Sequence, residues 1–154
     1  MKKHLPHPDF DKIVWETWTP VDKATLCFVI QDGQILLIEK KRGLGQGKIN
    51  GPGGRLEPGE TPEACAIRET EEELCITPTG LSQHGRLRFQ FADGYSLCCW
   101  LFRADGFVGT PTETPEAKPL WVPLDQVPYP RMWADDELWL PHFIRGCNIE
   151  GDFL

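Results

Sequence analysis

Three glutamates, Glu69, Glu72 and Glu73, are the residues whose type and spacing point most directly to chemistry. Upstream, Thr61 can cap a helix and Pro62 suits its first position, so a helix is predicted through this stretch. On that helix the three carboxylates share one face and repel one another by roughly 0.2–0.5 kcal/mol per pair. The cluster is therefore either a solvated surface or a site for a cation, and Mg²⁺ prefers such oxygen ligands.

The glutamates belong to a longer pattern that runs from residue 54 to residue 76. Five residues separate Gly54 from Glu60, seven separate Glu60 from Arg68, and the glutamates and the apolar Ile76 follow at fixed positions. This pattern resembles the Nudix box, the signature of hydrolases that act on nucleoside diphosphates linked to another group. The resemblance implies the α/β class and the Nudix fold, an α/β/α sandwich with a mixed β-sheet.

Two positions depart from that signature. Thr70 stands where an aliphatic residue is usual, and Cys75 replaces the glycine that closes the motif. Because a glycine there suits a left-handed helix end, Cys75 predicts a strained or differently closed terminus. The departures concern local geometry and leave the metal ligands in place.

The elements before the helix must bring it against a sheet. Residues 24–31 and 34–39 predict two strands, separated by the turn signal Asp32-Gly33. Residues 40–48 are rich in glycine and positive charge and predict a loop. Its basic residues either form a solvated rim or face phosphates, and Lys40 is the best candidate for the second role.

The segments after the helix predict a second pair of strands. Residues 81–102 alternate between apolar and polar and predict two antiparallel strands with one apolar face, joined by a two-residue hairpin at Asp93-Gly94. Residues 103–119 predict a loop that contains Glu116. A short strand is predicted at residues 120–124.

A tryptophan and two aspartates form the last informative group, at Trp133, Asp135 and Asp136. One interpretation is that Asp135 caps a helix and the acids favour its positive end. The other is a purine pocket, in which an aromatic face stacks on the base and carboxylates bond its edge. Two close carboxylates in a dry pocket seldom both ionise, so one of them could keep a proton and donate it.

From residue 25 to residue 144 the chain is similar to Nudix hydrolases of oxidised purine nucleoside triphosphates, such as 8-oxo-dGTP and 2-hydroxy-dATP. Departures at Ile49, Pro52 and Leu97 indicate that stacking on the base differs. The segments that match are Lys40-Lys41-Arg42-Gly43, Asn50-Gly51, Gly53-Gly54, Gly109-Thr110-Pro111, Leu124-Asp125-Gln126 and Met132-Trp133 with Asp135-Asp136.

This resemblance implies hydrolysis of the triphosphate to a monophosphate and pyrophosphate, which clears damaged nucleotides from the pool and avoids DNA damage. The cofactor implied is Mg²⁺, with Mn²⁺ as the alternative ion. The residues implied for substrate binding are Thr25, Lys40, Asn50, Gly53, Gly54, Phe89, Leu97, Trp133, Asp135 and Asp136. Those implied for the metal are Gly53, through its carbonyl, Glu69, Glu72, Glu73 and Glu116, and those implied for catalysis are Arg68, Glu69, Glu72 and Glu73.

The roles of some of these residues stay open. Glu73 or Glu116 could deprotonate the attacking water, or metal binding could acidify it enough. Arg68 is predicted to hold a glutamate in its rotamer. The alternative functions are hydrolysis of another nucleoside diphosphate derivative, such as a dinucleotide or nucleotide sugar, and a Nudix module that binds a nucleotide without cleaving it.

The composition of the 154 residues limits location and partners. No apolar run approaches the roughly 20 residues that cross a bilayer, so we expect a cytoplasmic protein without a membrane partner. A net charge of −7 disfavours a nucleic acid polymer, because its phosphates would be repelled. A small anionic substrate remains compatible with this charge, because bridging metals can reverse the local sign, and the resemblance implies a nucleotide. We also expect a monomer. The six cysteines show no paired spacing and predict buried free thiols.

The N-terminal residues 1–23 lie outside the resemblance, and residues 24–154 form the expected Nudix domain. In this extension, Trp15 and Trp18 are predicted to pack on the body of the protein. By contrast, His4 and His7 are predicted to lie in a loose terminus rather than to bind a metal.

Overall fold

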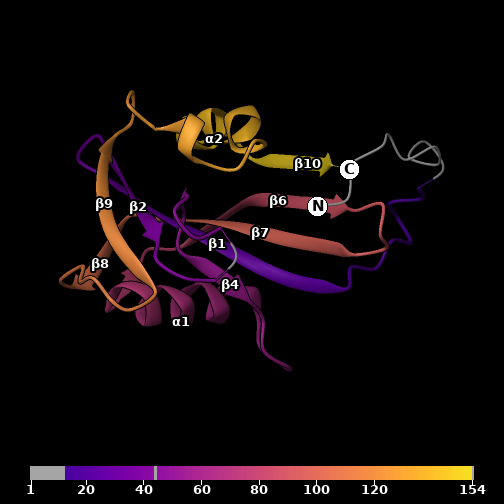
Figure 1. Cartoon of the computed structure of the whole chain (residues 1–154), viewed down its shortest axis with the longest axis horizontal. Helices are drawn as coiled ribbons and strands as arrows, with labels where there is room; N and C mark the ends of the chain where they lie inside the picture. The colour runs from indigo at the N-terminus through magenta and orange to yellow at the C-terminus, as the bar shows by residue number, and fades with distance from the viewer. Residues whose placement is uncertain (1–12, 44, 154) are drawn as a thin grey trace.

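An eight-stranded mixed sheet forms the centre of the computed structural model, which describes residues 13–43 and 45–153. Helix α1 (Pro62–Leu74) lies against one face of the sheet and helix α2 (Asp136–Ile144) against the other (Figure 1). This layering is the predicted α/β/α sandwich, so the fold class is confirmed.

The strands and a short 3-10 helix connect and flank these two helices in chain order. They are β1 (Asp22–Gln31), β2 (Gln34–Lys40), β3 (Ile49–Asn50), β4 (Gly53–Arg55), β5 (Ile76–Thr79), β6 (Ser82–Gln90), β7 (Ser96–Ala104), β8 (Gly106–Gly109), β9 (Ala117–Pro123), η2 (Tyr129–Arg131) and β10 (Ile149–Phe153).

Strand β1 is central and decides which segments meet. It pairs in parallel with β7 and antiparallel with β2 and β4. Beyond β7 lie β6 and then β10, which pairs in parallel with β6, while β3 and β9 pair with β2. Because Gly54 of β4 pairs with Thr25 of β1, the start of the Nudix box is held against the middle of the sheet.

Alternating residues of β1 supply two cores, one on each face of the sheet. Phe28 and Ile30 belong to the core under α2, and Cys27 and Val29 belong to the core under α1. On the α2 side, the ring of Phe28 lies 5.2 Å from that of Phe143 between centroids. A strand buried on both faces reads as a continuous apolar run, which explains why β1 could be predicted from sequence.

The segment after β7 was predicted incorrectly as one loop and one short strand. Residues 103–119 include β8, which pairs with β5, and the beginning of β9. The strand predicted at residues 120–124 starts earlier, because its ladder with β2 extends back to the pair of Ala117 and Lys40. Both elements are fixed by pairing partners far away in the sequence, which a local pattern does not reveal.

The hairpin between β6 and β7 is one residue longer than predicted. Phe91 N–H donates to the Tyr95 carbonyl at 2.8 Å, so three residues, Ala92 to Gly94, form the loop. Gly94 takes φ 92°, which suits the left-handed residue of a three-residue hairpin.

Cysteine positions depart from expectation at two sites. Cys75 closes α1 in the left-handed region, with φ 61° and ψ 29°, so the helix ends as it would with glycine but at the strain of a side chain. All six cysteines are free, as predicted, yet Cys75 and Cys147 are exposed rather than buried.

The described part of the N-terminal extension packs on the sheet, as predicted for Trp15 and Trp18. The Arg88 guanidinium lies over both rings, and Trp18 bonds Gln90. His4 and His7 lie outside the described residues. Among the described helices, none combines the length and apolar character needed to cross a membrane.

Candidate active site

Helix α1 carries the acidic cluster from a well-defined start. Thr61 accepts a hydrogen bond from the Ala64 N–H at 3.2 Å through its hydroxyl, and Pro62 opens the helix. Cys65 and Leu74 are among the residues that face the sheet, which fixes the rotation of the helix. The glutamates follow from that rotation.

Glu73 is the most buried carboxylate of the cluster, with 3% of its surface exposed. The Gly53 N–H donates to its Oε1 at 3.1 Å. Burial raises the pKa of Glu73 to about 8, and the hydrogen bond from Gly53 and the charge of Lys40 oppose that rise only in part. A buried carboxylate with so little compensation is suited to a cation.

Glu69 lies directly against the backbone of Gly54. A Cβ at residue 54 would come within 2.4 Å of the Glu69 carboxyl carbon, so a larger residue there would displace the Glu69 carboxylate from its present position. The pKa of Glu69 is raised by burial, with Arg68 opposing the effect. The glycine therefore serves the cluster sterically.

Arg68 ties the acids of the Nudix box together. It donates to Glu60 at 2.8 Å, to Glu69 at 2.9 Å and to Glu72 at 3.3 Å. The hydrogen bond from Arg68 is the main reason that the pKa of Glu60 falls to about 2. Arg68 thus holds several glutamates in place at once.

The remaining predicted metal residues are engaged elsewhere. Glu72 is half exposed and pairs with Arg68, while Glu116 lies 3.3 Å from Arg42. Within residues 13–43 and 45–153, no three His, Cys, Asp or Glu side chains are already grouped to hold a metal. Glu69 and Glu73 stand beside the glycine backbone, and the charges of Glu72 and Glu116 contribute to raising the pKa of Glu69.

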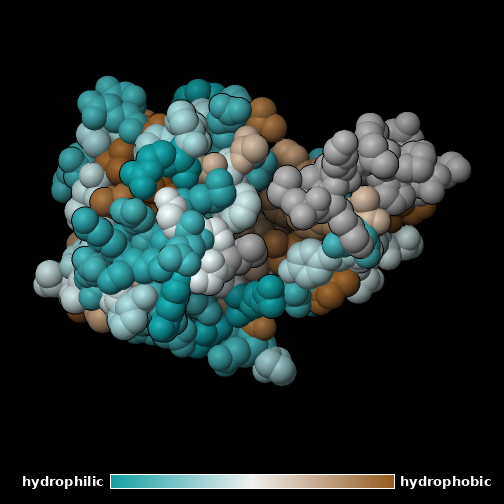
Figure 2. All heavy atoms as spheres, in the orientation of Figure 1, coloured by the Kyte–Doolittle hydropathy of each residue, from teal (hydrophilic) through white to brown (hydrophobic). Residues whose placement is uncertain are grey.

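A cavity of about 690 Å³ is lined by residues of β4, of the sheet strands β1, β6 and β7, and of the start of α2. In the space-filling view, a hollow with a hydrophobic floor opens among the hydrophilic side chains (Figure 2). All ten residues predicted for substrate binding line the cavity, as does Glu73. Further lining residues, which were not predicted from the sequence to bind substrate, include Phe91, Tyr95, Trp139 and Phe153.

Asp135 and Asp136 lie at the α2 end of the cavity. Asp135 is the N-cap residue of α2 but does not cap it with its side chain, so the capping part of the first interpretation was wrong, although Asp136 and Glu137 do lie in the first turn. The Oδ2 of Asp135 instead accepts from the Trp139 indole N–H at 3.0 Å. Asp136 is 5% exposed and its Oδ2 has no partner among the described residues. Burial, followed by the charge of Asp135, raises the pKa of Asp136 to about 7.

Trp133 is placed by the glycine-rich loop that follows β2. The Lys48 ammonium lies 4.9 Å from the ring centroid, and a Cβ at Gly45 would lie 3.1 Å from the ring. Asn50 accepts the Gly51 N–H through its side-chain oxygen, which leaves its amide N–H₂ for a ligand. The Thr25 hydroxyl instead donates to Cys65 on the α1 side, so the cavity meets other atoms of Thr25.

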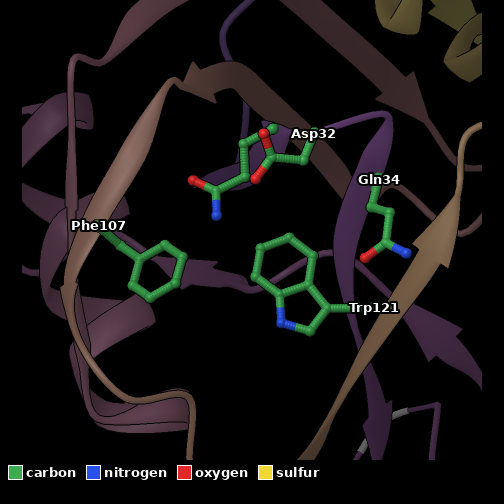
Figure 3. Close-up of a pocket in the computed structure, with 5 residues that line it drawn as sticks. Asp32, Gln34, Phe107 and Trp121 are labelled. Carbon is green, nitrogen blue, oxygen red and sulfur yellow. The ribbon is translucent and has the colours of Figure 1, made fainter.

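A second, shallower hollow of about 270 Å³ lies beside the β1–β2 turn. Figure 3 shows the rings of Phe107 and Trp121 pointing toward one another, with Asp32 and Gln34 around them. Asp32 is the sole charged side chain that lines it. It lacks the combination of acids and glycine backbone that marks the first site.

The fold, the glycine-bordered glutamates and the adjoining cavity together define a nucleotide hydrolase of the Nudix type. Residues 20–143 match the NUDIX domain family, and the chain belongs to that family. The chain is 42% identical over 130 residues to the oxidized purine nucleoside triphosphate hydrolase of Danio rerio, with 84% of this chain and 83% of the relative covered. It is 40% identical to the Mus musculus protein of the same name, over the same shares of the two chains.

A solved structure agrees with this assignment. The crystal structure of a MutT protein from Bacillus halodurans superposes with a TM-score of 0.72 at 29% sequence identity, covering 80% of this chain and 82% of that one.

Proposed function

We propose that this chain hydrolyses oxidised purine nucleoside triphosphates to the monophosphate and pyrophosphate, and so removes damaged nucleotides from the pool. The two relatives from Danio rerio and Mus musculus are named as hydrolases of oxidized purine nucleoside triphosphates and align over most of their length. We further propose that residues 24–154 act as one Nudix domain. A cytoplasmic location and a monomeric state stay predictions.

One observation carries the proposal: a single cavity reaches from a buried glutamate whose charge is only partly compensated to a buried aspartate with one oxygen that has no hydrogen-bond partner among the described residues. Glu73 and Gly53 line one end, and Asp135 and Asp136 line the other. A triphosphate directed toward the first end and a purine against the second would occupy the cavity as one molecule. The acids at the two ends then have separate tasks.

The residues at the α1 end fit Mg²⁺, or Mn²⁺ in its place. Glu69 and Glu73 would hold the ion with the Gly53 carbonyl, and Glu72 and Glu116 would complete the set, all of them hard oxygen donors. The contact between Gly54 and Glu69 supports this set, because glycine leaves room for the Glu69 carboxylate where it stands. When bound, Mg²⁺ would neutralise phosphate charge and polarise phosphorus toward attack by water.

The chain's own residues supply the remaining steps near the phosphates. Arg68 keeps the glutamates oriented, and Lys40, which lines the cavity, offers a positive charge to the phosphate chain. Glu73 and Glu116 are the two candidates to accept the proton of the attacking water. Burial raises the pKa of Glu73 to about 8, which makes its carboxylate a stronger base than an ordinary glutamate.

The base would be recognised at the α2 end. With a pKa of about 7, Asp136 can keep a proton and donate to an oxidised purine, while Asp135 accepts. Asn50 adds an amide donor, and Trp133 covers one face of the ring. A pair that can both donate and accept would suit purines with altered edge patterns.

The decisive experiment measures pyrophosphate release with Mg²⁺ from a panel of ordinary and oxidised purine deoxynucleoside triphosphates. ADP-ribose and a dinucleoside polyphosphate are included for the alternative hydrolase activity, and calorimetric binding of each nucleotide tests for a non-catalytic module. We expect the highest kcat/KM on an oxidised purine. A preference for ADP-ribose or the dinucleotide, or binding without turnover, would contradict the proposal.

A further inference from the structure

Strand β6 has one face toward the cavity and the other toward the segment before β1. Near it, the rings of Phe89, Phe91 and Phe153 line the cavity, and we call these three rings its aromatic wall. The front face of β6, defined by Leu87 and Phe89, lines the cavity. Its back face, defined by Arg88 and Gln90, contacts the segment before β1. Side chains alternate between the two faces of a strand, so contacts on the back face help to fix the backbone that carries Leu87 and Phe89 on the front face.

The front face presents stacked rings rather than interlocked side chains. The Phe89 ring lies 5.3 Å from that of Phe153 at an interplanar angle of 19°, and 6.4 Å from that of Phe91 at 16°. All three rings line the cavity. The strands β6 and β10, which carry Phe89 and Phe153, are also held on the face that points away from the cavity.

The back face is fixed through Arg88. Its guanidinium lies 4.7 Å from the Trp15 ring centroid and 6.0 Å from that of Trp18. It also donates to the Trp15 carbonyl at 3.1 Å and pairs through two bonds, 2.7 and 3.0 Å, with Asp152 of β10. One arginine therefore joins the N-terminal segment to both strands that carry the stacked rings.

A second connection reaches the β6–β7 hairpin. The Trp18 indole N–H donates to Gln90 Oε1 at 2.8 Å, and the Gln90 amide donates in turn to the carbonyls of Phe91 and Tyr95. The Val21 N–H adds a bond of 2.8 Å to the Ser96 hydroxyl. Residues 15–21 thus contact the β6–β7 hairpin, which carries the Phe91 ring just before its loop.

We propose that Trp15 and Trp18 are positioning residues for the nucleotide cavity, acting through Arg88 and Gln90 to hold its aromatic wall. Both tryptophans, and the β10 residue Asp152 that Arg88 bonds, lie outside residues 20–143 matched by the family. Segments on either side of the matched region therefore meet on β6 and shape a site whose acids lie elsewhere. The inference rests on the proposed function, since the wall is assigned to the nucleotide.

The test compares kcat and KM of the double variant Trp15→Ala/Trp18→Ala with those of the wild-type chain. Trp121→Ala is the matched control, because this partly exposed tryptophan lines the distant hollow of Figure 3. We expect the double variant to raise KM about tenfold, equivalent to about 1.4 kcal/mol, with kcat unchanged. The conservative double variant Trp15→Phe/Trp18→Phe keeps both rings and should recover most of the affinity.

Assays use the best nucleotide of the panel at a temperature where circular dichroism shows each variant folded. An unchanged KM in the double variant, a loss confined to kcat, or an equal rise in KM with Trp121→Ala would overturn the inference. If the double variant does not fold, the single variant Trp15→Ala takes its place, and a smaller rise in KM with kcat unchanged is expected, because Arg88 keeps its contacts with Trp18 and Asp152. If the wild-type chain prefers another nucleotide, the proposed function is refuted but this inference is not. The KM of the variants for that nucleotide then tests whether the tryptophans position the aromatic wall.

Discussion

At the scale of single residues, Glu73 combines the deepest burial of the cluster with a hydrogen bond from Gly53. Replacing it by glutamine keeps the shape and the acceptor for Gly53 but removes the charge. We predict that Glu73→Gln lowers kcat/KM by more than about 100-fold, the upper end of losses for residues that merely support a ligand. In the wild-type protein, Mg²⁺ should raise the melting temperature, and in this variant that rise should be lost.

Glu63→Gln provides the matched control for this measurement. Glu63 lies in the first turn of the same helix and is exposed, so both the activity and the Mg²⁺ effect should persist. Full Mg²⁺-dependent turnover in Glu73→Gln would remove Glu73 from the metal site.

Which residues line the cavity could be anticipated from the sequence where the residue itself carried the signal. The glycines and glutamates of the Nudix box had distinctive spacing, and so did the tryptophan and aspartates at the start of α2. Phe153 carried none, because it becomes part of the wall only when β10 pairs with β6. The direction of the Thr25 hydroxyl was equally hidden, since it depends on the packing of Cys65.

At the scale of secondary structure elements, the start of α1 depends on the cap at Thr61. We predict that Thr61→Ala lowers the free energy of unfolding by about 1 kcal/mol, because the Ala64 N–H loses its acceptor. The glutamates lie beyond the first turn, so Mg²⁺-dependent turnover at low temperature should not change. Urea denaturation measures the first effect, with the exposed Thr110→Ala as the control. A variant as stable as wild type would show that the cap contributes nothing.

Elements with their own periodicity could be predicted, and elements made by pairing could not. β1, β2 and α1 carry apolar patterns that fix their type before any partner is known. β10 has few apolar residues, and its register is supported by two ion pairs across the strands, Arg86 with Glu150 and Arg88 with Asp152. Such pairs become visible only once the two segments lie side by side.

At the scale of the whole molecule, the sheet connects two acidic sites that differ in what compensates their negative charge. The glutamates on the α1 side are suited to a cation, while the aspartates on the α2 side are suited to sharing a proton. Both sites open into one cavity because β4 crosses beside β1 and leaves glycine backbone between them. The family resemblance predicted this arrangement, but composition and periodicity alone did not.

The proton on Asp136 should be measurable in the stability of the whole protein. Its pKa is about 7 in the folded state against an ordinary 3.8, so between these values the folded chain holds a proton that the unfolded chain has released. The contribution of Asp136 to stability is therefore full below about pH 4 and is lost as pH rises to about 7, by up to roughly 1.4 kcal/mol per pH unit. Asp136→Asn has no such proton.

We predict that wild type loses unfolding free energy relative to Asp136→Asn as the pH rises from about 4 to about 7. Above about pH 7 the difference between the two proteins should no longer change with pH. Urea denaturation from about pH 4 to about pH 8, in a chelator so that the glutamates carry no metal in either protein, measures that difference. The exposed Asp125→Asn should show no comparable trend. Parallel curves for wild type and Asp136→Asn would mean that Asp136 ionises normally, and the cavity would then lack the donor that its base recognition requires.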